Sequence, residues 1–551
     1  MANLGSEDSE IYDVLIVGAG PCGLAVAARL SEDTPSALFT DSEHQRYHWM
    51  KKAASQSSKA QKVSRRSKTA SDRLVTGATN PQTKRLNMKV LDASSDTWMH
   101  SWDTKFKDLG ISHLRSPMFF HPDPRDRDGL LGFVYKEGRE KELVEIGNVV
   151  GKGLSKYQRK MKVKNSGRRK QEINYLDERD RNDYFRPSQA LFKNFCQDIT
   201  TRYGIEDIVE KSEVNHISYE KSVSATSAGI FSIHTSTGVK RARIIVLATG
   251  AALKPSLPSD CPFCGLEKEG SVTHAFAKSG KHRLPEHLLN RIKKRQITNV
   301  VVIGGGLTSA QIVDTAVKAG VTKVWHLMRG PLKVKHFDVD LPWVGKYKNY
   351  HLATFWSADD DEERAEMIRT ARNGGSITPE YHKILTSHIS SGRAALYTNT
   401  TITKACWSPE SQTWTLETSR EMEIELPHID HVIYATGLSP DFKMNPCLKE
   451  LHEKEQIECV GGLPCLTDDL MWNDDMPFFV TGRMAGLRLG PGSGNLEGAR
   501  AGAERIAWKI GDMLREEQAE RGDDAVESVD SRRLGLGINN QFSIFAEPEL
   551  E

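Results

Sequence analysis

The sequence predicts an α/β protein with two parallel-sheet units in one chain, and three observations lead to this prediction. A glycine-rich turn follows a β-branched apolar run twice, in residues 12–23 and in residues 297–309. Each turn precedes an Ala-rich amphipathic stretch, which gives it the strand–turn–helix context that a nucleotide fingerprint requires. An Ala-Thr-Gly triplet ends a later apolar strand in each half, at residues 248–250 and 435–437. This order predicts two Rossmann-like, three-layer dinucleotide-binding domains.

In the first unit, three glycines have distinct expected roles. Gly18 permits the tight turn, Gly20 lets the backbone approach a pyrophosphate, and Gly23 lets the helix pack closely on the strand. The helix N-terminus then offers free N–H groups to the phosphates. An acid at the end of the next strand, expected over residues 36–41, would hold ribose hydroxyls. Asp41 lies 23 residues after Gly18, near the usual spacing of about 20. The alternatives are Glu43, or a merely polar strand end.

In the second unit, Gly304, Gly306 and Ser309 occupy the three positions, and a small serine suffices for close packing. The next strand ends near Arg329, 25 residues after Gly304, where an NAD site would place an acid. A guanidinium suits a 2′-phosphate, and two lysines follow it, so the sequence favours NADPH over NADH.

Length and composition restrict the class of protein. The 551 residues suffice for two or three domains, and the net charge of +2, from 75 basic and 73 acidic residues, points to no nucleic-acid partner. No apolar stretch is long enough for a membrane span, and the polar N-terminus is unlike a signal peptide. Eight scattered cysteines fit a reduced, cytoplasmic setting. Basic stretches at about 51–84 and 152–170 are interpreted as a disordered insertion and a solvated loop.

Two further segments carry a resemblance to a known family. Residues 430–438 resemble the Asp-x-x-x-Leu/Phe-Ala-Thr-Gly-Tyr element of N-hydroxylases, departing from it at Tyr434 and Leu438, and residues 481–499 resemble the closing segment of flavin domains. With the two fingerprints, the chain resembles two-dinucleotide-binding-domain flavoproteins over about residues 11–515, outside the basic insertion. More narrowly, it is similar to the single-component FAD/NADPH monooxygenases that include ornithine and lysine N-hydroxylases and the oxidative-stress-induced growth inhibitor proteins. An intact Baeyer–Villiger signature, Phe-x-Gly-x-x-x-His, is absent.

The resemblance implies an NADPH domain inserted in a discontinuous FAD domain. The expected boundaries are 11–255 and 426–515 for the two parts of the FAD domain, 256–425 for the NADPH domain, and 516–551 for a flexible tail. The implied function is that of a flavoprotein oxidoreductase, a monooxygenase that uses FAD, NADPH and O₂. It would insert one oxygen atom into a small nucleophilic substrate through a flavin C4a-(hydro)peroxide, with N-hydroxylation of an amine or amino acid favoured. The expected partners are a small-molecule substrate and O₂, with no nucleic acid and no membrane span, and the oligomeric state stays open.

The resemblance also suggests site residues. Residues 98–121 would run past the flavin ring, so His113, Arg115 and His121 are candidates for lining the reaction cavity, with ordinary loop and core roles as the alternative. No metal ligand is expected. The remaining expected cofactor contacts are Val214, Gly250, Gly437, Gly482, Asn495 and Leu496.

Two other functions stay open at this point. Cys261 and Cys264 form a C-x-x-C pair, the motif of dithiol–disulfide oxidoreductases, although their surroundings look like an interdomain linker. The chain is alternatively a non-catalytic FAD-binding regulatory protein. Flavin reduction by NADPH and O₂ uptake by the purified protein would separate these readings.

Overall fold

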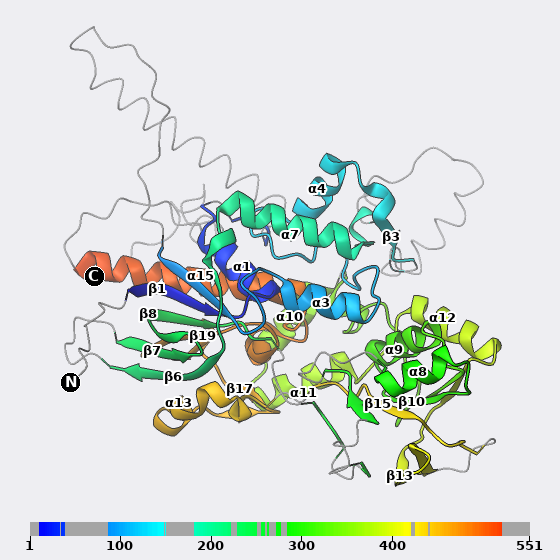
Figure 1. The fold of residues 1–551 in the computed structure, drawn as a ribbon. Coiled ribbons are helices and arrows are strands. Elements are labelled where there is room, and N and C mark those ends of the chain that lie inside the picture. Colours follow the sequence, from blue (N-terminus) through cyan, green and yellow to red (C-terminus); the bar gives the residue numbers. More distant parts are fainter. Residues whose placement is uncertain are drawn as a thin grey trace, which may run out of the picture.

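The fold is built on two large sheets in separate lobes (Figure 1). A computed structural model describes residues 10–33, 35–38, 86–147, 149, 181–221, 229–250, 255–258, 262–263, 271–276, 284–345, 347–419, 425–438 and 441–520. The two basic stretches and the residues after 520 lie outside these ranges. Among the described residues, no helix has the length and apolar character needed to cross a membrane.

The first lobe contains the larger sheet, whose main path runs β18-β19-β8-β1-β2-β5. β1 (Ile11–Val17) is central and pairs in parallel with β2 (Met88–Asp92) and β8 (Gly238–Leu247). β8 also pairs in parallel with β19 (Met476–Val480), so a strand from the C-terminal part completes this sheet. The other members are β18 (Met471–Asn473), β5 (Val209–Lys211), β6 (Val214–Glu220) and β7 (Ile230–Thr235).

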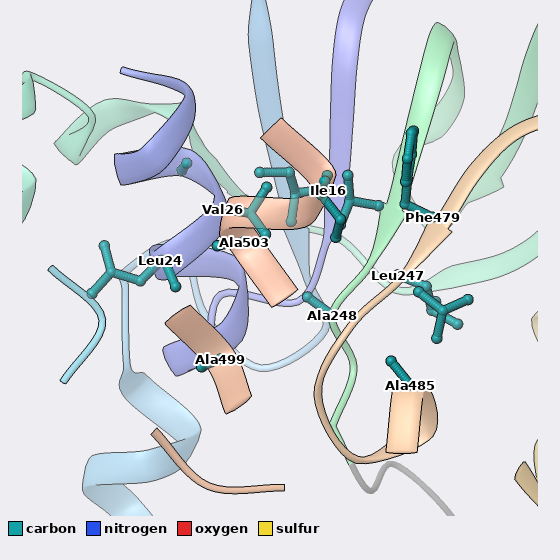
Figure 2. Close-up of a cluster of buried hydrophobic side chains, with 14 of the residues drawn as sticks. Ile16, Leu24, Val26, Leu247, Ala248, Phe479, Ala485, Ala499 and Ala503 are labelled. Atoms are coloured by element: carbon teal, nitrogen blue, oxygen red, sulfur yellow. The ribbon is translucent and has the colours of Figure 1, made fainter. Parts of the chain in front are cut away.

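The core of the first lobe lies between this sheet and two helices from opposite ends of the chain. α1 (Pro21–Leu30) starts with proline at its first position and packs against α15 (Leu496–Glu520). Figure 2 shows small side chains on α15, Ala499 and Ala503, beside the α1 face that carries Val26. Because alanine has a short side chain, the helices approach closely and cover the buried strands.

The second lobe has a five-stranded, all-parallel sheet in the order β12-β11-β10-β15-β9. Its strands are buried apolar runs, as expected for a parallel sheet covered on both faces. They are β9 (Val272–His274), β10 (Asn299–Ile303), β11 (Lys323–Leu327), β12 (Ala394–Tyr397) and β15 (His431–Tyr434). α9 (Leu307–Lys318) and α12 (Pro379–Ser390) pack together, and a hairpin of β13 (Ile402–Ser408) and β14 (Thr413–Thr418) adjoins the sheet.

The chain enters and leaves the second lobe at neighbouring points. Pro255 and Leu438 form an antiparallel bridge, and Ser256 N–H donates to Gly437 O over 3.0 Å. The second sheet is therefore an insertion between β8 and β18 of the first, which is the predicted discontinuous arrangement. β15 extends this sheet to Tyr434, past the expected domain boundary at 425.

The strand expected over residues 36–41 is wrong for the part that the structure describes. Ser36 and Ala37 donate backbone N–H groups to Pro124 O, and residues 37–38 form a turn. The parallel neighbour of β1 on this side is β2, which comes only after the basic insertion. A short apolar run after a helix suggested a strand, but β2 occupies that place in the sheet.

The remaining elements surround these two sheets. They are α3 (His100–Asp108), α4 (Gly129–Glu137), β3 (Leu143–Glu145), β4 (Phe185–Pro187), α7 (Gln189–Tyr203), α8 (Glu286–Lys293), α10 (Lys348–Trp356), α11 (Asp361–Arg372), α13 (Lys449–Lys454), β16 (Cys459–Val460), β17 (Leu463–Pro464) and α14 (Gly486–Leu489).

Candidate functional site

The first glycine-rich turn lies at the carboxyl end of β1, where two of its glycines allow contacts that no other residue would. Gly18 has φ +113°, and a Cβ there would lie 2.6 Å from Ala248 O. A Cβ on Gly23 would lie 2.0 Å from Gly18 O, so the helix and the strand end approach to backbone contact. Gly20 caps α1 in an extended conformation, and a Cβ there would have no neighbour within 4 Å. The open space at Gly20 leaves the N-terminus of α1 accessible to a phosphate.

The second turn repeats this geometry at the carboxyl end of β10. Gly304 has φ +154°, and its Cβ would lie 2.4 Å from Ala435 O. Gly306 caps α9 in an extended conformation, as Gly20 caps α1. In both lobes the alanine carbonyl of the Ala-Thr-Gly triplet lies against the first glycine of the fingerprint. This contact explains physically why each fingerprint is followed by its own triplet.

A buried histidine supports the second turn, where serine replaces the third glycine. Ser309 Oγ donates to Gly306 O over 2.7 Å, and His326 Nε2 lies 2.8 Å from Gly304 O and 3.0 Å from Ser309 Oγ. Burial lowers the pKa of His326 to about 4, so the ring is neutral at neutral pH. A neutral ring that bonds a carbonyl through Nε2 must carry its proton there. His326 thus tethers the turn, a role that the glycine spacing did not indicate.

The acid next to the first turn is Asp92, the last residue of β2. Its Oδ2 accepts the Ala19 N–H over 3.0 Å, inside the glycine-rich turn. Asp92 therefore occupies the position expected of a ribose-binding carboxylate, at the end of the strand next to β1. Asp41, the predicted acid, lies outside the described residues. The sequence does contain a signal for Asp92, because this acid ends an apolar run at 88–92. The signal was missed because Asp92 lies much further from Gly18 than the usual spacing.

Two more strand ends meet the first turn from the other side. Gly250 follows β8 with φ +63°, and Gly482 follows β19 with φ +73°. A Cβ on Gly482 would lie 3.0 Å from Cys22 Sγ, and Thr481 N–H donates to Leu247 O over 3.1 Å. Burial raises the pKa of the Cys22 thiol to about 12, which makes it a packing group and no nucleophile.

The glycine-rich tail ends at the start of α15. Asn495 Oδ1 accepts the N–H groups of Glu497 and Gly498, at 3.0 and 3.2 Å, and so caps the helix that begins at Leu496. A Cβ on Gly498 would lie 2.4 Å from Ser493 Cα, so the turn is folded tightly onto the first turn of the helix. The positive end of the α15 dipole therefore faces the turn.

The remaining predicted cofactor contacts lie at strand ends. Val214 is the first residue of β6. Two residues before it, Ser212 N–H donates to Asp92 O over 2.9 Å, which places the start of β6 near the end of β2. Gly437 follows β15 with φ +88° at the crossing between the lobes. Arg329 follows β11 with an exposed side chain that forms no hydrogen bond or ion pair with any described residue. A cation in this position is free to meet a phosphate.

The structure places the three candidate catalytic residues in different surroundings. His121 is fully buried, bonds Arg127 O through Nε2 at 2.8 Å, and packs edge-on against Phe195. His113 is half-buried beside Ser112 Oγ, and burial and then Arg186 lower its pKa. Both side chains contact loop or core groups, and a place in the reaction cavity stays a prediction for each.

Arg115 instead joins the two lobes. Its Nε donates to His336 O over 2.9 Å, and its Nη2 donates to Lys335 O and Ser376 Oγ, both over 3.0 Å. The guanidinium is thus occupied by the second lobe, which leaves it a positioning role. The alternative C-x-x-C pair, Cys261 and Cys264, lies outside the described residues.

Comparison with known proteins agrees with this geometry. A family model described as L-lysine 6-monooxygenase/L-ornithine 5-monooxygenase matches residues 173–440. A search of curated proteins by sequence found no match. Among solved structures, ornithine hydroxylase PvdA of Pseudomonas aeruginosa has a TM-score of 0.54 at 17% identity, covering 92% of this chain and 100% of that one.

Two further structures are similar. The ornithine N-hydroxylase KtzI of Kutzneria sp. 744 has a TM-score of 0.57 at 16% identity, covering 92% of this chain and 100% of that one. The cadaverine monooxygenase DfoA of Erwinia amylovora has a TM-score of 0.56 at 15% identity, covering 91% and 94%. At these identities the solved structures show the fold. With the family match, they bear out the predicted resemblance, the α/β fold class and the assignment as a monooxygenase.

Proposed function

We propose that this chain uses FAD, NADPH and O₂ to hydroxylate the nitrogen of a small amine or amino acid. The observation that carries the proposal is the repeated turn geometry. Two fingerprints, each backed by an alanine carbonyl at 2.4–2.6 Å from the first glycine's Cβ position, lie in adjoining lobes of one chain. The monooxygenase family match supports the choice of chemistry.

In this proposal the first lobe holds FAD. The open space at Gly20 and the N-terminus of α1 suit the pyrophosphate, and Asp92 suits the ribose hydroxyls. Gly250 and Gly482 keep the strand ends free of side chains, and the Asn495-capped start of α15 provides a positive dipole end. When bound, FAD would accept a hydride from NADPH and activate O₂ for transfer of one oxygen atom.

The second lobe would hold NADPH. Gly304 and Gly306 shape the turn, and Ser309 and His326 hold it by hydrogen bonds. Arg329 has an exposed guanidinium with no described partner and suits the 2′-phosphate. These assignments rest on the match between strand ends and the known demands of a dinucleotide.

The protein's own contribution would be positioning and exclusion of water. Arg115 ties the segment 111–121 of the first lobe to residues 335–337 through three hydrogen bonds and to Ser376 through a fourth. A fixed distance between the lobes would hold the nicotinamide and flavin sites in register. A small-molecule substrate belongs to the same proposal. So does a cytoplasmic setting, which the free thiols of the described cysteines support.

The test is substrate-stimulated turnover with product analysis. We expect the purified chain to carry FAD, and we expect ornithine, lysine, putrescine or cadaverine to stimulate NADPH oxidation and yield a product heavier by one oxygen atom. Under ¹⁸O₂ the product should carry the label, with hydrogen peroxide measured in parallel to count uncoupled turnover. Flavin reduction with no labelled product from any amine would refute N-hydroxylation. Absence of flavin reduction by NADPH would refute the assignment as an NADPH-dependent oxidoreductase.

A further inference from the structure

Three arginines surround one carboxylate where the two lobes meet. Arg372, the last residue of α11, donates through Nη1 to Asp338 Oδ2 over 3.0 Å and to Pro491 O over 3.3 Å. Arg483 follows β19 and faces both Arg372 and Asp338. Arg115 lies near the same pair. We call Arg115, Arg372, Arg483 and Asp338 the interlobe arginine cluster.

The charge of this cluster is not balanced by its described neighbours. Three guanidinium groups face a single aspartate, and Lys335, the nearby lysine, is already paired with Asp340 at 2.7 Å. Burial is the largest influence on Arg115 and Arg483 and lowers the pKa of both, that of Arg115 to about 10. Half-buried cations in excess attract an anion strongly, because little water is present to screen them.

Arg483 is the member with a free guanidinium. Arg115 is bonded to backbone carbonyls and a serine, and Arg372 is bonded to Asp338. The Arg483 guanidinium forms no hydrogen bond or ion pair with any residue in the described part of the chain. Its stem lies against the glycine-rich tail, since a Cβ on Gly494 would be 3.5 Å from Arg483 Cβ. The fork geometry of guanidinium suits a planar or tetrahedral oxyanion.

The cluster lies between the two fingerprints. Arg483 directly follows Gly482, whose Cβ position is 3.0 Å from Cys22 Sγ in the first turn. Arg372 lies three residues before Gly375, whose Cβ position is 2.8 Å from Gly306 N in the second turn. An anion held here would therefore lie near both dinucleotide sites.

We propose that Arg372 and Arg483 form an oxyanion subsite that takes a carboxylate or phosphate group at the junction of the lobes. The inference rests on the proposed function, because it gives the subsite to a ligand of that reaction. Two sources offer this chemistry: the α-carboxylate of an amino-acid substrate, or the pyrophosphate of NADPH. A substrate carboxylate would place the ω-amino group further along the crevice and would make amino acids better ligands than the matching diamines.

The test compares Arg483→Gln with wild type and with Arg369→Gln. Arg369 is an exposed arginine on α11, one turn before Arg372, and pairs with Glu366. Since the Arg483 guanidinium forms no hydrogen bond or ion pair with any described residue, its replacement by glutamine should leave the thermal midpoint unchanged. In one arm, calorimetry of the FAD-loaded protein measures the dissociation constant of NADP⁺. In the other arm, flavin absorbance changes measure binding of lysine against cadaverine and of ornithine against putrescine, with NADP⁺ present.

Each outcome decides between sources or refutes the subsite. If the anion is a substrate carboxylate, R483Q should weaken amino-acid binding about 10- to 100-fold, as expected for loss of a charge-assisted hydrogen bond, and leave diamines unaffected. If it is the pyrophosphate, R483Q should weaken NADP⁺ binding by a similar factor. Changes below about twofold in both arms, or equal changes in R369Q, overturn the proposal. Arg483-dependent binding without hydroxylated product would refute the proposed function and leave the subsite standing.

Discussion

The contact between Gly304 and Ala435 allows a direct test of the second dinucleotide site, by Gly304→Ala. The added Cβ would lie 2.4 Å from Ala435 O and 2.9 Å from Ala435 C, both backbone atoms that cannot move aside alone. The positive φ of +154° adds strain for any residue with a side chain. Strain of about 1–3 kcal/mol and overpacking of about 1–3 kcal/mol together predict a loss of about 2–6 kcal/mol in the stability of the second lobe.

The matched control is Gly305→Ala, one residue further on. A Cβ there meets nothing within 4 Å, and Gly305 has no positive φ. We expect G304A to lower the urea midpoint of the second lobe and to abolish NADP⁺ binding, while the FAD content stays at the wild-type level. The two lobes should be followed with separate probes, flavin fluorescence and tryptophan fluorescence, because a two-lobe chain need not unfold in one step. Equal NADP⁺ affinity and equal urea midpoints in G304A and G305A would refute the assigned role of this contact.

Three further predictions concern individual polar side chains. Asp92→Asn should raise the FAD dissociation constant about tenfold or more, through loss of a charged acceptor, and full retention of FAD on dialysis would contradict it. The folded pKa of His326, about 4, lies below its unfolded value of 6.5, so its contribution to stability is present above pH 6.5 and is lost as the pH falls toward 4. His326→Gln should weaken the pH dependence of the urea midpoint between pH 6.5 and about 4. The same decrease of the midpoint with falling pH in the variant and the wild type would argue against this. Arg29→Met should cost about 3–5 kcal/mol, because it leaves the buried Glu504, 2.6 Å from Arg29 Nε, without its partner. The double variant with Glu504→Leu should recover much of that loss in urea unfolding, and no recovery would exclude the charge as the cause.

Much of the architecture was predictable because its signals are local. Gly18 and Gly304 each follow a β-branched run, and a tight turn with φ above zero can be recognised within a few residues. The inserted order of the domains was expected from the family resemblance, which rests on the order of turns and triplets. The position of His326 was not predictable in this way, because its partner Gly304 lies 22 residues away and is reached only across neighbouring strands.

The missed residues have a common physical reason. The search for the ribose acid assumed a short crossover from α1 to the next strand, and the basic insertion lengthens that crossover, so Asp92 replaces the expected strand end. Loop length costs little free energy, so an insertion can move a site residue far along the sequence without moving it in space. Arg115 and His121 were chosen by position in a segment, and only packing shows that one binds the other lobe and the other is enclosed.

The sheet of the first lobe has a consequence for how the chain matures on the ribosome. Its central strand β1 is made first, yet β19 and α15, which complete the sheet and cover α1, are encoded after residue 475. Domains usually fold as they emerge, at about 5–20 residues per second. Here the inserted second lobe can form its own five-stranded sheet before β19, which completes the sheet of the first lobe, has been synthesised. The part that is translated first is therefore finished last, and a nascent chain stalled before β19 should expose the apolar edge of β8.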